Sequence, residues 1–515
     1  MSSQITATKH MPKFVFLPTD LALYAQLIVL ALYLRYALRA PLLRQTWRYV
    51  AKDAAAMSAG MVLALFVLVA LVDSIHFRPL LPPAPGASAS AAAPAGAASG
   101  AATPAVAVVA YSTQTLSLLD VLLTGPREAR EKTYSVPLAT HQFSKESMLQ
   151  NGVSVRDFPR LQFGGKHLTA PQSQWGADVA HRSLRGLAGG ALLALVVGAL
   201  LVVRQARVWR VSLWEALVTL WHGGVEFPVR ALWLTLLAIA LVVGWVAALW
   251  PYYHVMGTDQ TGNDVLFLAL KSIRTAVVIG SLATLSTIPL AVVFGILAGY
   301  FKGWVDDAIQ YFYTVLSSIP SVLLISAFVL MIQVFIDKNP QMFETGLERG
   351  DVRLFLLAAI LGITGWASLA RLLRAETLKL GELDYVQAAR AFGVSDFGIM
   401  RRHILPNLTH VIVIVAVLDF SGLVLYEAVL SYVGVGVDPN TNSFGVMING
   451  ARNEMSRDPV IWWTLATAFG FMVALVLSMT LFASAVREAF DPRARAFRVR
   501  PLKAPKPQVA KVAAP

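Results

Sequence analysis

The chain has 515 residues, of which 56% are hydrophobic and 14% are charged, and its mean hydropathy is +0.61. This composition excludes an ordinary soluble domain and predicts an integral membrane protein. The formal net charge of +13 comes from basic residues that cluster beside apolar runs, so it predicts contact with the lipid bilayer and no nucleic-acid partner. No cysteine is present, which excludes disulfides and thiolate metal sites.

Apolar runs of about 20 residues match the hydrocarbon core of a bilayer. The backbone of a spanning segment must satisfy its own hydrogen bonds, and these runs are too uniformly apolar for the alternating strands of a barrel. We therefore predict an all-α polytopic membrane protein. Its nine spans fall at residues 21–38, 54–72, 187–203, 231–250, 276–298, 311–336, 354–369, 411–433 and 461–482.

Short basic segments follow the first, third, seventh and ninth runs, at residues 35–52, 204–210, 371–402 and 487–511. Basic loops stay in the cytoplasm, and four segments that each follow an odd-numbered span fall on one side of the membrane. The alternation predicts an external N-terminus and a cytoplasmic C-terminus.

The same runs divide the chain into five parts. The segment between the second and third spans is external, and its residues 111–185 form either a small docked subdomain or an ordered loop on the membrane domain. The parts are an N-terminal extension with two spans (1–73), a periplasmic insertion (74–186) that contains an Ala/Pro-rich linker (82–110), a third extra span with an amphipathic helix (187–228), a compact six-span domain (229–490) and a basic cytoplasmic tail (491–515).

Two local features refine this division. Trp214, Leu217, Val218 and Trp221 recur at i, i+3, i+4 and i+7, which predicts an amphipathic helix that lies in the membrane interface or packs on the protein in the cytoplasm. Pro320 lies inside the sixth predicted span and is expected to kink it.

A polar insert, QAARAFGVSDFGIMRRHILPN, occupies residues 387–407 in the third basic segment. Gly393 is suited to end a first helix because glycine adopts a positive φ at little cost, and Ser395 can cap a second helix. Pro406 marks where the second helix must end or bend. Small residues at Ala388 and Ala389 would let another protein approach the first helix. We expect a stiff helix-turn-helix that protrudes into the cytoplasm.

This insert resembles the cytoplasmic coupling segment of the permeases of ABC importers, which docks into a groove of a separate ATPase subunit. One residue departs from the family pattern, since Gln387 replaces the usual acid. The matching or aligned positions are Gln387, Ala388, Ala389, Gly393, Leu405 and Pro406.

Two external stretches narrow the resemblance to the C-type permease subunit of dipeptide, oligopeptide and nickel importers. GTDQTGNDVL is similar to a GTD-x-x-G-R-D segment of that branch, with Asn263 in place of the arginine, and residues 430–452 are similar to its LSFLGLG segment. The positions that match in the first stretch are Gly257, Thr258, Asp259, Gly262 and Asp264.

The resemblance covers roughly the second half of the chain and implies a six-helix type I importer permease core, preceded here by about three extra spans. It implies a multi-pass subunit of the bacterial inner membrane that forms half of a pore for di- or oligopeptides or related small solutes. The expected partners are a homologous second permease, ABC ATPase subunits and a periplasmic substrate-binding protein. No GxxxxGK[ST] motif occurs, so ATP and Mg²⁺ are expected on the ATPase, and no cofactor or catalytic residue is assigned to this chain.

Two carboxylates lie within the eighth predicted span, Asp419 near its middle and Glu427 two turns later. Intramembrane carboxylates are costly, so they are candidates for lining the pore; the alternative is that they are protonated or hydrogen-bonded to neighbouring helices. They also leave open an ion-gradient-driven secondary transporter in which they relay protons. Asp259 and Asp264 are interpreted as turn-formers, and no metal site is assigned.

Overall fold

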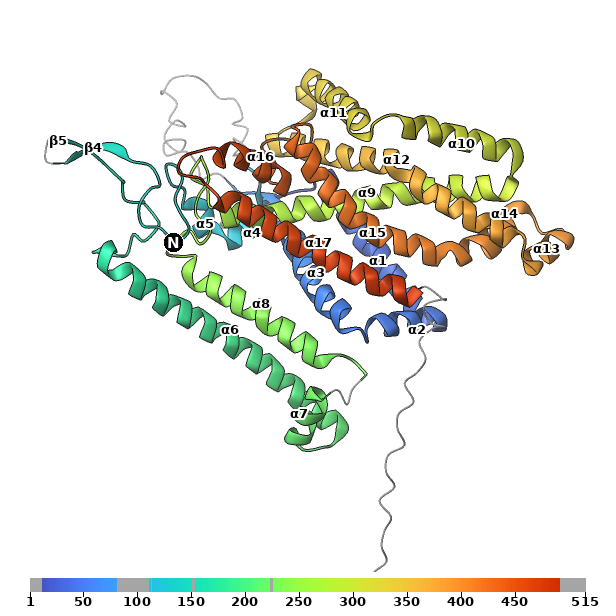
Figure 1. Cartoon of the computed structure of the whole chain (residues 1–515), viewed down its shortest axis with the longest axis horizontal. Helices are drawn as coiled ribbons and strands as arrows, with labels where there is room; N and C mark the ends of the chain where they lie inside the picture. The colour runs from blue at the N-terminus through green and yellow to red at the C-terminus, as the bar shows by residue number, and fades with distance from the viewer. Residues whose placement is uncertain (1–11, 81–110, 113, 151–152, 223–225, 491–515) are drawn as a thin grey trace, which may run out of the picture.

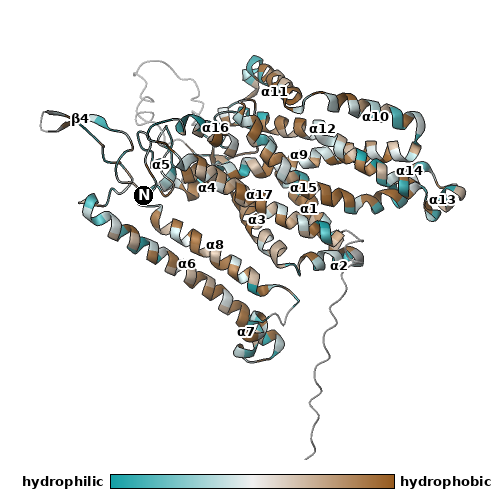
Figure 2. Ribbon diagram, viewed as in Figure 1, coloured by the Kyte–Doolittle hydropathy of each residue, from teal (hydrophilic) through white to brown (hydrophobic). Residues whose placement is uncertain are grey.

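The computed structural model describes residues 12–80, 111–112, 114–150, 153–222 and 226–490 (Figure 1). The linker predicted at 82–110 and the tail predicted at 491–515 lie outside these residues. Within the described part, nine helices are long and apolar enough to cross a membrane, which confirms the predicted number of spans. Figure 2 shows that the spans are mostly hydrophobic and that hydrophilic residues gather toward their ends.

The helices extend beyond the apolar runs because charged and polar residues continue them on either side of the membrane core. Their bounds are α1 (Pro18–Arg39), α2 (Pro41–Val50), α3 (Ala54–Asp73), α4 (Leu118–Leu122), α5 (Thr124–Glu128), α6 (Pro171–Trp209), α7 (Leu213–Trp221), α8 (Val229–Leu249), α9 (Val265–Phe301), α10 (Gly303–Ser318), α11 (Ser321–Lys338), α12 (Gly346–Gly381), α13 (Asp384–Ala391), α14 (Asp396–Ile399), α15 (Leu405–Tyr432), α16 (Phe444–Glu454) and α17 (Trp463–Phe490). A 3₁₀ turn (Pro340–Met342) and a π-helical turn (Met400–Ile404) complete the helical elements.

The main body is built on α9, which packs along α12 and also against α15, α3 and α17. Small residues allow this close packing: a Cβ atom added at Gly295 of α9 would lie 2.8 Å from the carbonyl oxygen of Ala370 on α12. At Gly280, on another face of α9, an added Cβ would lie 2.7 Å from the ring of Phe420 on α15. Glycine at helix contacts is typical of membrane bundles, where close van der Waals packing replaces the hydrophobic effect.

The helix α8 was expected to belong to one compact six-span block, but it packs mainly along α6 instead. An added Cβ at Gly190 of α6 would lie 2.2 Å from the carbonyl oxygen of Ala240, and one at Gly244 of α8 would lie 2.5 Å from that of Gly186. The α6–α8 hairpin forms a separate arm beside the body (Figure 1). An apolar run shows that a helix faces lipid or protein but does not identify its neighbour, so the sequence did not reveal this pairing.

The sixth predicted span is broken rather than kinked. Helix α10 ends at Ser318 and α11 begins at Ser321, so Ile319 and Pro320 are not helical. Pro320 instead occupies the cap position of α11, where its missing N–H group costs no intrahelical hydrogen bond.

The residues predicted to form an external insertion build short elements that dock on one end of the spans. An antiparallel sheet joins β1 (Lys13–Val15), β2 (His76–Arg78) and β3 (Leu116–Ser117), so the segment before α1 lies at the same end of the bundle as the insertion. A separate hairpin of β4 (Glu146–Gln150) and β5 (Val153–Asp157) projects away from the helices (Figure 1). The basic segments around α2, α7 and α13 lie at the opposite end.

The predicted amphipathic helix is α7. Ser212 caps its first turn, accepting a hydrogen bond from the backbone N–H of Glu215, while the Glu215 carboxylate accepts one from the backbone N–H of Ser212. Its placement in the membrane interface stays a prediction.

Candidate functional site

A short helical hairpin follows α12 at the end of the body that was predicted to face the cytoplasm. Helix α13 ends before Gly393, whose φ of +76° is the left-handed conformation predicted for a helix-ending glycine. Ser395 then caps α14 by accepting a hydrogen bond from the backbone N–H of Gly398 at 3.3 Å, also as predicted. The structure therefore contains the expected helix-turn-helix, formed by residues 384–399, and we call it the coupling hairpin.

The two faces of α13 have different environments. Val386 and Ala389 are buried against the body, whereas Gln387 and Ala388 are exposed. The expectation that Ala388 and Ala389 both face an incoming protein is therefore wrong for Ala389, because the helix uses this small side chain to approach its own protein. Ala388 remains available on the outer face.

Polar contacts fix the coupling hairpin to the body. The hydroxyl of Tyr300, at the end of α9, donates a hydrogen bond to Asp396 at 2.6 Å, and the guanidinium of Arg390 lies 5.2 Å from the centre of the Tyr300 ring. On the other side, Asn407 donates a hydrogen bond to the hydroxyl of Tyr385 at 3.0 Å. The hairpin is thus linked to both α9 and α15.

The second helix does not end at Pro406, the first of the two alternatives predicted from the sequence. The helix runs from α14 through the π turn Met400–Ile404 into α15, and Pro406 lies in the first turn of α15. The backbone N–H of Leu405 donates to the carbonyl of Met400, five residues earlier, instead of four. This wider turn admits the proline ring, which would clash with a carbonyl in a regular α-helix. Leu405 is half-buried and Pro406 is exposed.

Large aromatic side chains stand uncovered at the turn of the coupling hairpin. Phe392, which is 87% exposed, directly precedes the turn at Gly393. Phe397, which is 69% exposed, follows Gly393 by four residues. Tyr385 is 42% exposed on the adjoining helix. Clustered exposed aromatic groups on a protein surface are typical of a protein-binding site.

The two candidate pore carboxylates lie on α15 in different surroundings. Asp419 is half-buried, and no hydrogen bond or ion pair to it is found among the described residues. Glu427 is 2% exposed and accepts a hydrogen bond from Ser431 at 2.7 Å, and an added Cβ at Gly445 of α16 would lie 3.1 Å from its carboxylate. Direct contact of a solute with Glu427 would therefore require α16 to move, whereas Asp419 needs no such rearrangement.

The external stretch 257–264 forms a compact turn before α9. Gly257 has a φ of +70°, and an added Cβ would lie 2.4 Å from the carbonyl oxygen of Ser135 in the insertion. Gly262 has a φ of +79°, and its Cβ would lie 1.9 Å from the carbonyl oxygen of Glu131. Glycine is required at both positions by the backbone conformation and by the close approach of the insertion.

Polar side chains in this turn are used within the protein. Thr258 is fully buried, and its carbonyl oxygen accepts a hydrogen bond from the indole of Trp463 on α17 at 3.0 Å. Asp259 accepts hydrogen bonds from the backbone N–H groups of Thr261 and Asn263, both at 2.8 Å. Asp264 caps α9. The two aspartates thus form turns and caps, as interpreted from the sequence.

The second half of the chain is similar to known proteins. The family described as the binding-protein-dependent transport system inner membrane component matches residues 291–496. The oligopeptide transport system permease protein OppC of Lactococcus lactis subsp. cremoris (strain SK11) is 33% identical over 242 residues, which cover 47% of this chain and 76% of that protein. This chain belongs to the permease family of binding-protein-dependent ABC importers.

Further relatives place this permease among those of the peptide type. OppC of Escherichia coli (strain K12) is 29% identical over 242 residues, covering 47% of this permease and 73% of that protein. The dipeptide transport system permease protein DppC of Lactococcus lactis subsp. cremoris (strain MG1363) is 29% identical over 241 residues, covering 47% and 64%. A chain in an inward-facing structure of the MetNI methionine ABC transporter aligns with a TM-score of 0.34 and 16% identity, covering 44% of this permease and 97% of that chain.

The loop between α8 and α9 of this permease contains a buried charged group that the sequence did not reveal and that contacts the insertion. His254 lies between two carboxylates, with its Nδ1 atom 2.8 Å from Asp264 and its Nε2 atom 3.5 Å from Glu131. Burial by itself lowers the pKa of His254, but the hydrogen bonds and charges of Asp264 and Glu131 outweigh it and raise the pKa to about 9. The imidazolium therefore links the insertion to the turn that begins α9.

A second buried cluster connects the N-terminal extension of the permease to α9 and α12. Arg274 donates hydrogen bonds to Asp20 of α1 at 2.6 Å and to Asp351 of α12 at 2.9 Å, and His76 lies 2.8 Å from Asp20. All four side chains are buried. The predicted span began at residue 276, whereas α9 begins at Val265; an arginine only two residues before the apolar run was the available signal.

Proposed function

We propose that this permease forms one half of the translocation pore of a bacterial inner-membrane importer, which takes up di- or oligopeptides or related small solutes. The support for the substrate class is that the relatives named above are oligopeptide and dipeptide transport permeases. Family membership favours an ATP-driven importer over an ion-gradient-driven transporter. Within the described residues, no group of three or more His, Asp or Glu side chains is arranged to hold a metal ion. We assign no catalytic role to the chain.

The observation that carries the coupling proposal is the exposed aromatic surface of the coupling hairpin. Phe392 and Phe397 project from a rigid element at the cytoplasmic end, where water would otherwise cover them. A groove on an ATPase subunit that buries these rings would recover much of the hydrophobic free energy, about 25 cal/mol for each Å² of apolar surface removed from water. Ala388 provides a low spot on the same outer face for close approach of the partner backbone.

The hairpin is also connected so that its movement would reach the spans. It is contiguous with α15 through the π turn and is hydrogen-bonded to Tyr300 at the end of α9. Next to it, Lys302 and Glu382 join the ends of α9 and α12 at 2.6 Å, and Arg374 of α12 forms a two-point ion pair with Asp306 of α10. ATP-driven closure of the partner would shift these helices together as a rigid group. ATP and Mg²⁺ belong to that partner.

Asp419 is proposed to line the pore against a homologous second permease. A half-buried carboxylate in the middle of a span, with no protein partner among the described residues, is stabilised best by a water-filled path. Its charge would favour the amino groups of peptides. For Glu427 the proposal holds only in a conformation in which α16 has moved away.

A periplasmic binding protein is proposed to deliver substrate to the external face. The buried residues of the 257–264 turn hold this face in place, because Gly262 packs against Glu131 of the insertion and Thr258 is hydrogen-bonded to Trp463 of α17. The outward contacts would then come from exposed groups such as Thr261 and from the insertion itself.

Site-specific crosslinking tests the coupling proposal. The chain has no cysteine, so Phe392→Cys introduces one thiol at the turn. We expect this variant to crosslink to the ATPase subunit and its yield to change when nucleotide is added. The matched control is Leu149→Cys, which is 81% exposed on the external hairpin. Crosslinking of neither variant, or equal crosslinking of both, would contradict the proposal, and so would uptake driven by a proton gradient without any ATPase.

A further inference from the structure

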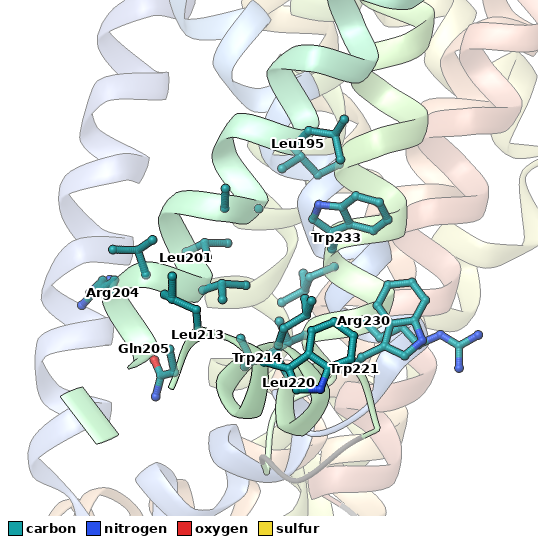
Figure 3. A pocket seen from close by; sticks show the side chains of 18 of the residues that line it. Leu195, Leu201, Arg204, Gln205, Leu213, Trp214, Leu220, Trp221, Arg230 and Trp233 are labelled. Carbon is teal, nitrogen blue, oxygen red and sulfur yellow. The ribbon is translucent and has the colours of Figure 1, made fainter. Parts of the chain in front are cut away.

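A large cavity lies between α6, α7 and α8 near their cytoplasmic ends, away from the coupling hairpin and the pore residues (Figure 3). Its volume is about 900 Å³, which is at the upper end of the range of ligand pockets, roughly 300–1,000 Å³. Met61 of α3 contributes to one side, so the cavity lies where the α6–α8 arm faces the body. No residue proposed above for transport lines it.

The lining is dominated by aliphatic and aromatic side chains from all three helices. Helix α7 supplies Leu213, Trp214 and Leu217, which are 58%, 72% and 41% exposed, and all three line the cavity. Glu215 lies on the opposite, polar face of α7 and is exposed, whereas Ala216, at the flank of the apolar face, is fully buried. The apolar face of this amphipathic helix therefore points into the cavity, and no other part of the described chain covers it.

One wall of the cavity is held in place by specific packing. The ring of Trp233 lies directly over Gly198 of α6, where an added Cβ would come within 2.5 Å of its Nε1 atom. The same Nε1–H donates a hydrogen bond to the carbonyl oxygen of Ala194 at 3.3 Å. Trp221 packs edge-on against Trp233 with ring centres 5.9 Å apart. Tryptophan is enriched at the level of lipid headgroups, where its apolar ring and its polar N–H group are both satisfied.

The rim of the cavity is basic. Arg204 and Arg230 line it together with Gln205, and the guanidinium of Arg230 stacks 5.1 Å from the ring of Trp221. Among the described residues, no acidic side chain forms an ion pair with either arginine. The positive-inside pattern places this rim at the cytoplasmic surface, where anionic lipids give the membrane a negative potential.

We infer that this cavity binds an anionic phospholipid of the cytoplasmic leaflet. Its phosphate would lie at the rim beside one of the two guanidinium groups, since Arg204 and Arg230 point to opposite sides of the cavity (Figure 3), and its acyl chains would cover the apolar residues of α7 and α8. A free anion would leave the apolar surface uncovered, and a protein segment would have to supply an acidic group beside a long apolar stretch. A phospholipid combines the required charge and shape in one molecule. The inference needs only the membrane orientation and does not rest on coupling to an ATPase.

Lipid retention by the full-length chain tests this inference. The wild type and the double variant Arg204→Gln/Arg230→Gln are purified in detergent and titrated with phosphatidylglycerol, and bound lipid is counted by native mass spectrometry. One basic residue near an anionic surface is worth about fivefold in affinity, so the double variant is expected to bind roughly 25-fold more weakly. Phosphatidylcholine, whose headgroup has no net charge, is expected to bind weakly to both proteins.

A matched control separates a defined site from general attraction to charge. Arg35 and Arg39 are exposed at the cytoplasmic end of α1 and do not line the cavity, so Arg35→Gln/Arg39→Gln should retain phosphatidylglycerol like the wild type. Equal loss in both double variants, or equal binding of the two lipids, would overturn the inference. Displacement by millimolar inorganic phosphate would indicate a free-anion site, and loss of the lipid on assembly with the second permease would indicate a protein occupant; either result also overturns it. Thermal unfolding curves verify that each variant is folded.

Discussion

The turn of the coupling hairpin offers a direct test of ATPase docking through two substitutions at one residue. Gly393 has a φ of +76°, and an added Cβ would meet no atom within 4 Å. Both Gly393→Ala and Gly393→Trp therefore incur the same backbone strain, about 1–2 kcal/mol for an L-residue in the left-handed region, and neither produces a clash within the chain. We expect the two variants to insert in the membrane and to unfold at similar temperatures.

The two variants should differ in transport. The methyl group of Gly393→Ala leaves the outer surface of the hairpin nearly unchanged. Uptake should therefore fall by no more than about threefold, which is the factor expected if part of the backbone strain weakens docking of the ATPase. The indole of Gly393→Trp would occupy the space in which the ATPase groove is proposed to sit. We expect this variant to lose uptake by more than about tenfold while the ATPase subunit still hydrolyses ATP, because a bulky group at the turn costs more than 1.4 kcal/mol of docking free energy.

Proteoliposomes that contain both permeases, the ATPase and the binding protein allow uptake and ATP hydrolysis to be measured together. Gly434→Trp is the matched control, since Gly434 also has a positive φ, +87°, and no atom within 4 Å of an added Cβ, but it lies at the external end of α15. Normal transport by Gly393→Trp would refute the docking argument. So would an equal loss in Gly393→Ala, which would assign the effect to backbone strain.

Three further outcomes test the buried charges. Arg274→Gln removes the cation beside two buried carboxylates and should destabilise the protein by about 3–5 kcal/mol in thermal unfolding. In the same assay Arg349→Gln, which breaks an exposed ion pair, should cost less than about 1 kcal/mol, and equal effects would contradict the reasoning. The pKa of His254 is about 9 in the folded protein against 6.5 in the unfolded chain, and this difference stabilises the fold by about 3 kcal/mol below pH 6.5, an effect that is lost as the pH rises through 9. The difference in unfolding free energy between wild type and His254→Gln should therefore narrow from pH 6 to pH 10, and a constant difference would count against the charged imidazolium. Asp419→Asn should leave the melting temperature unchanged, since no partner is lost, but should lower uptake of cationic peptides about tenfold relative to neutral ones, and identical losses for both would argue against a place in the pore.

Local chemistry explains which parts of the hairpin could be predicted from sequence. Gly393 and Ser395 were assigned correctly because a left-handed turn and an N-cap depend on a few adjacent residues. Ala389 was assigned wrongly because it is buried against the body, and the continuation of the helix past Pro406 was missed because a π turn accommodates the proline. Local rules contain no information on either.

The same distinction holds for the spans. Hydrophobicity was sufficient to count nine helices, because the bilayer imposes one length and one polarity on each of them. It was not sufficient to find the start of α9, since Lys271 and Arg274 interrupt the apolar pattern while their charges are balanced by residues far away in sequence. It also did not show that α8 pairs with α6, which depends on matching glycines such as Gly190 and Gly244.

The π turn at Met400–Ile404 sets the direction in which the coupling hairpin points relative to α15. Each residue of a regular helix advances by about 100° around the axis, so the additional residue in a π turn offsets everything before it by that angle relative to α15. Removing one residue from this connection would keep the residues on either side of it but would rotate Phe392 and Phe397 to a different direction around the axis of α15. Chimaeras that transfer the coupling hairpin from one transporter to another must therefore include this π turn. Without it, the exposed aromatic residues of the hairpin would point in a different direction relative to α15.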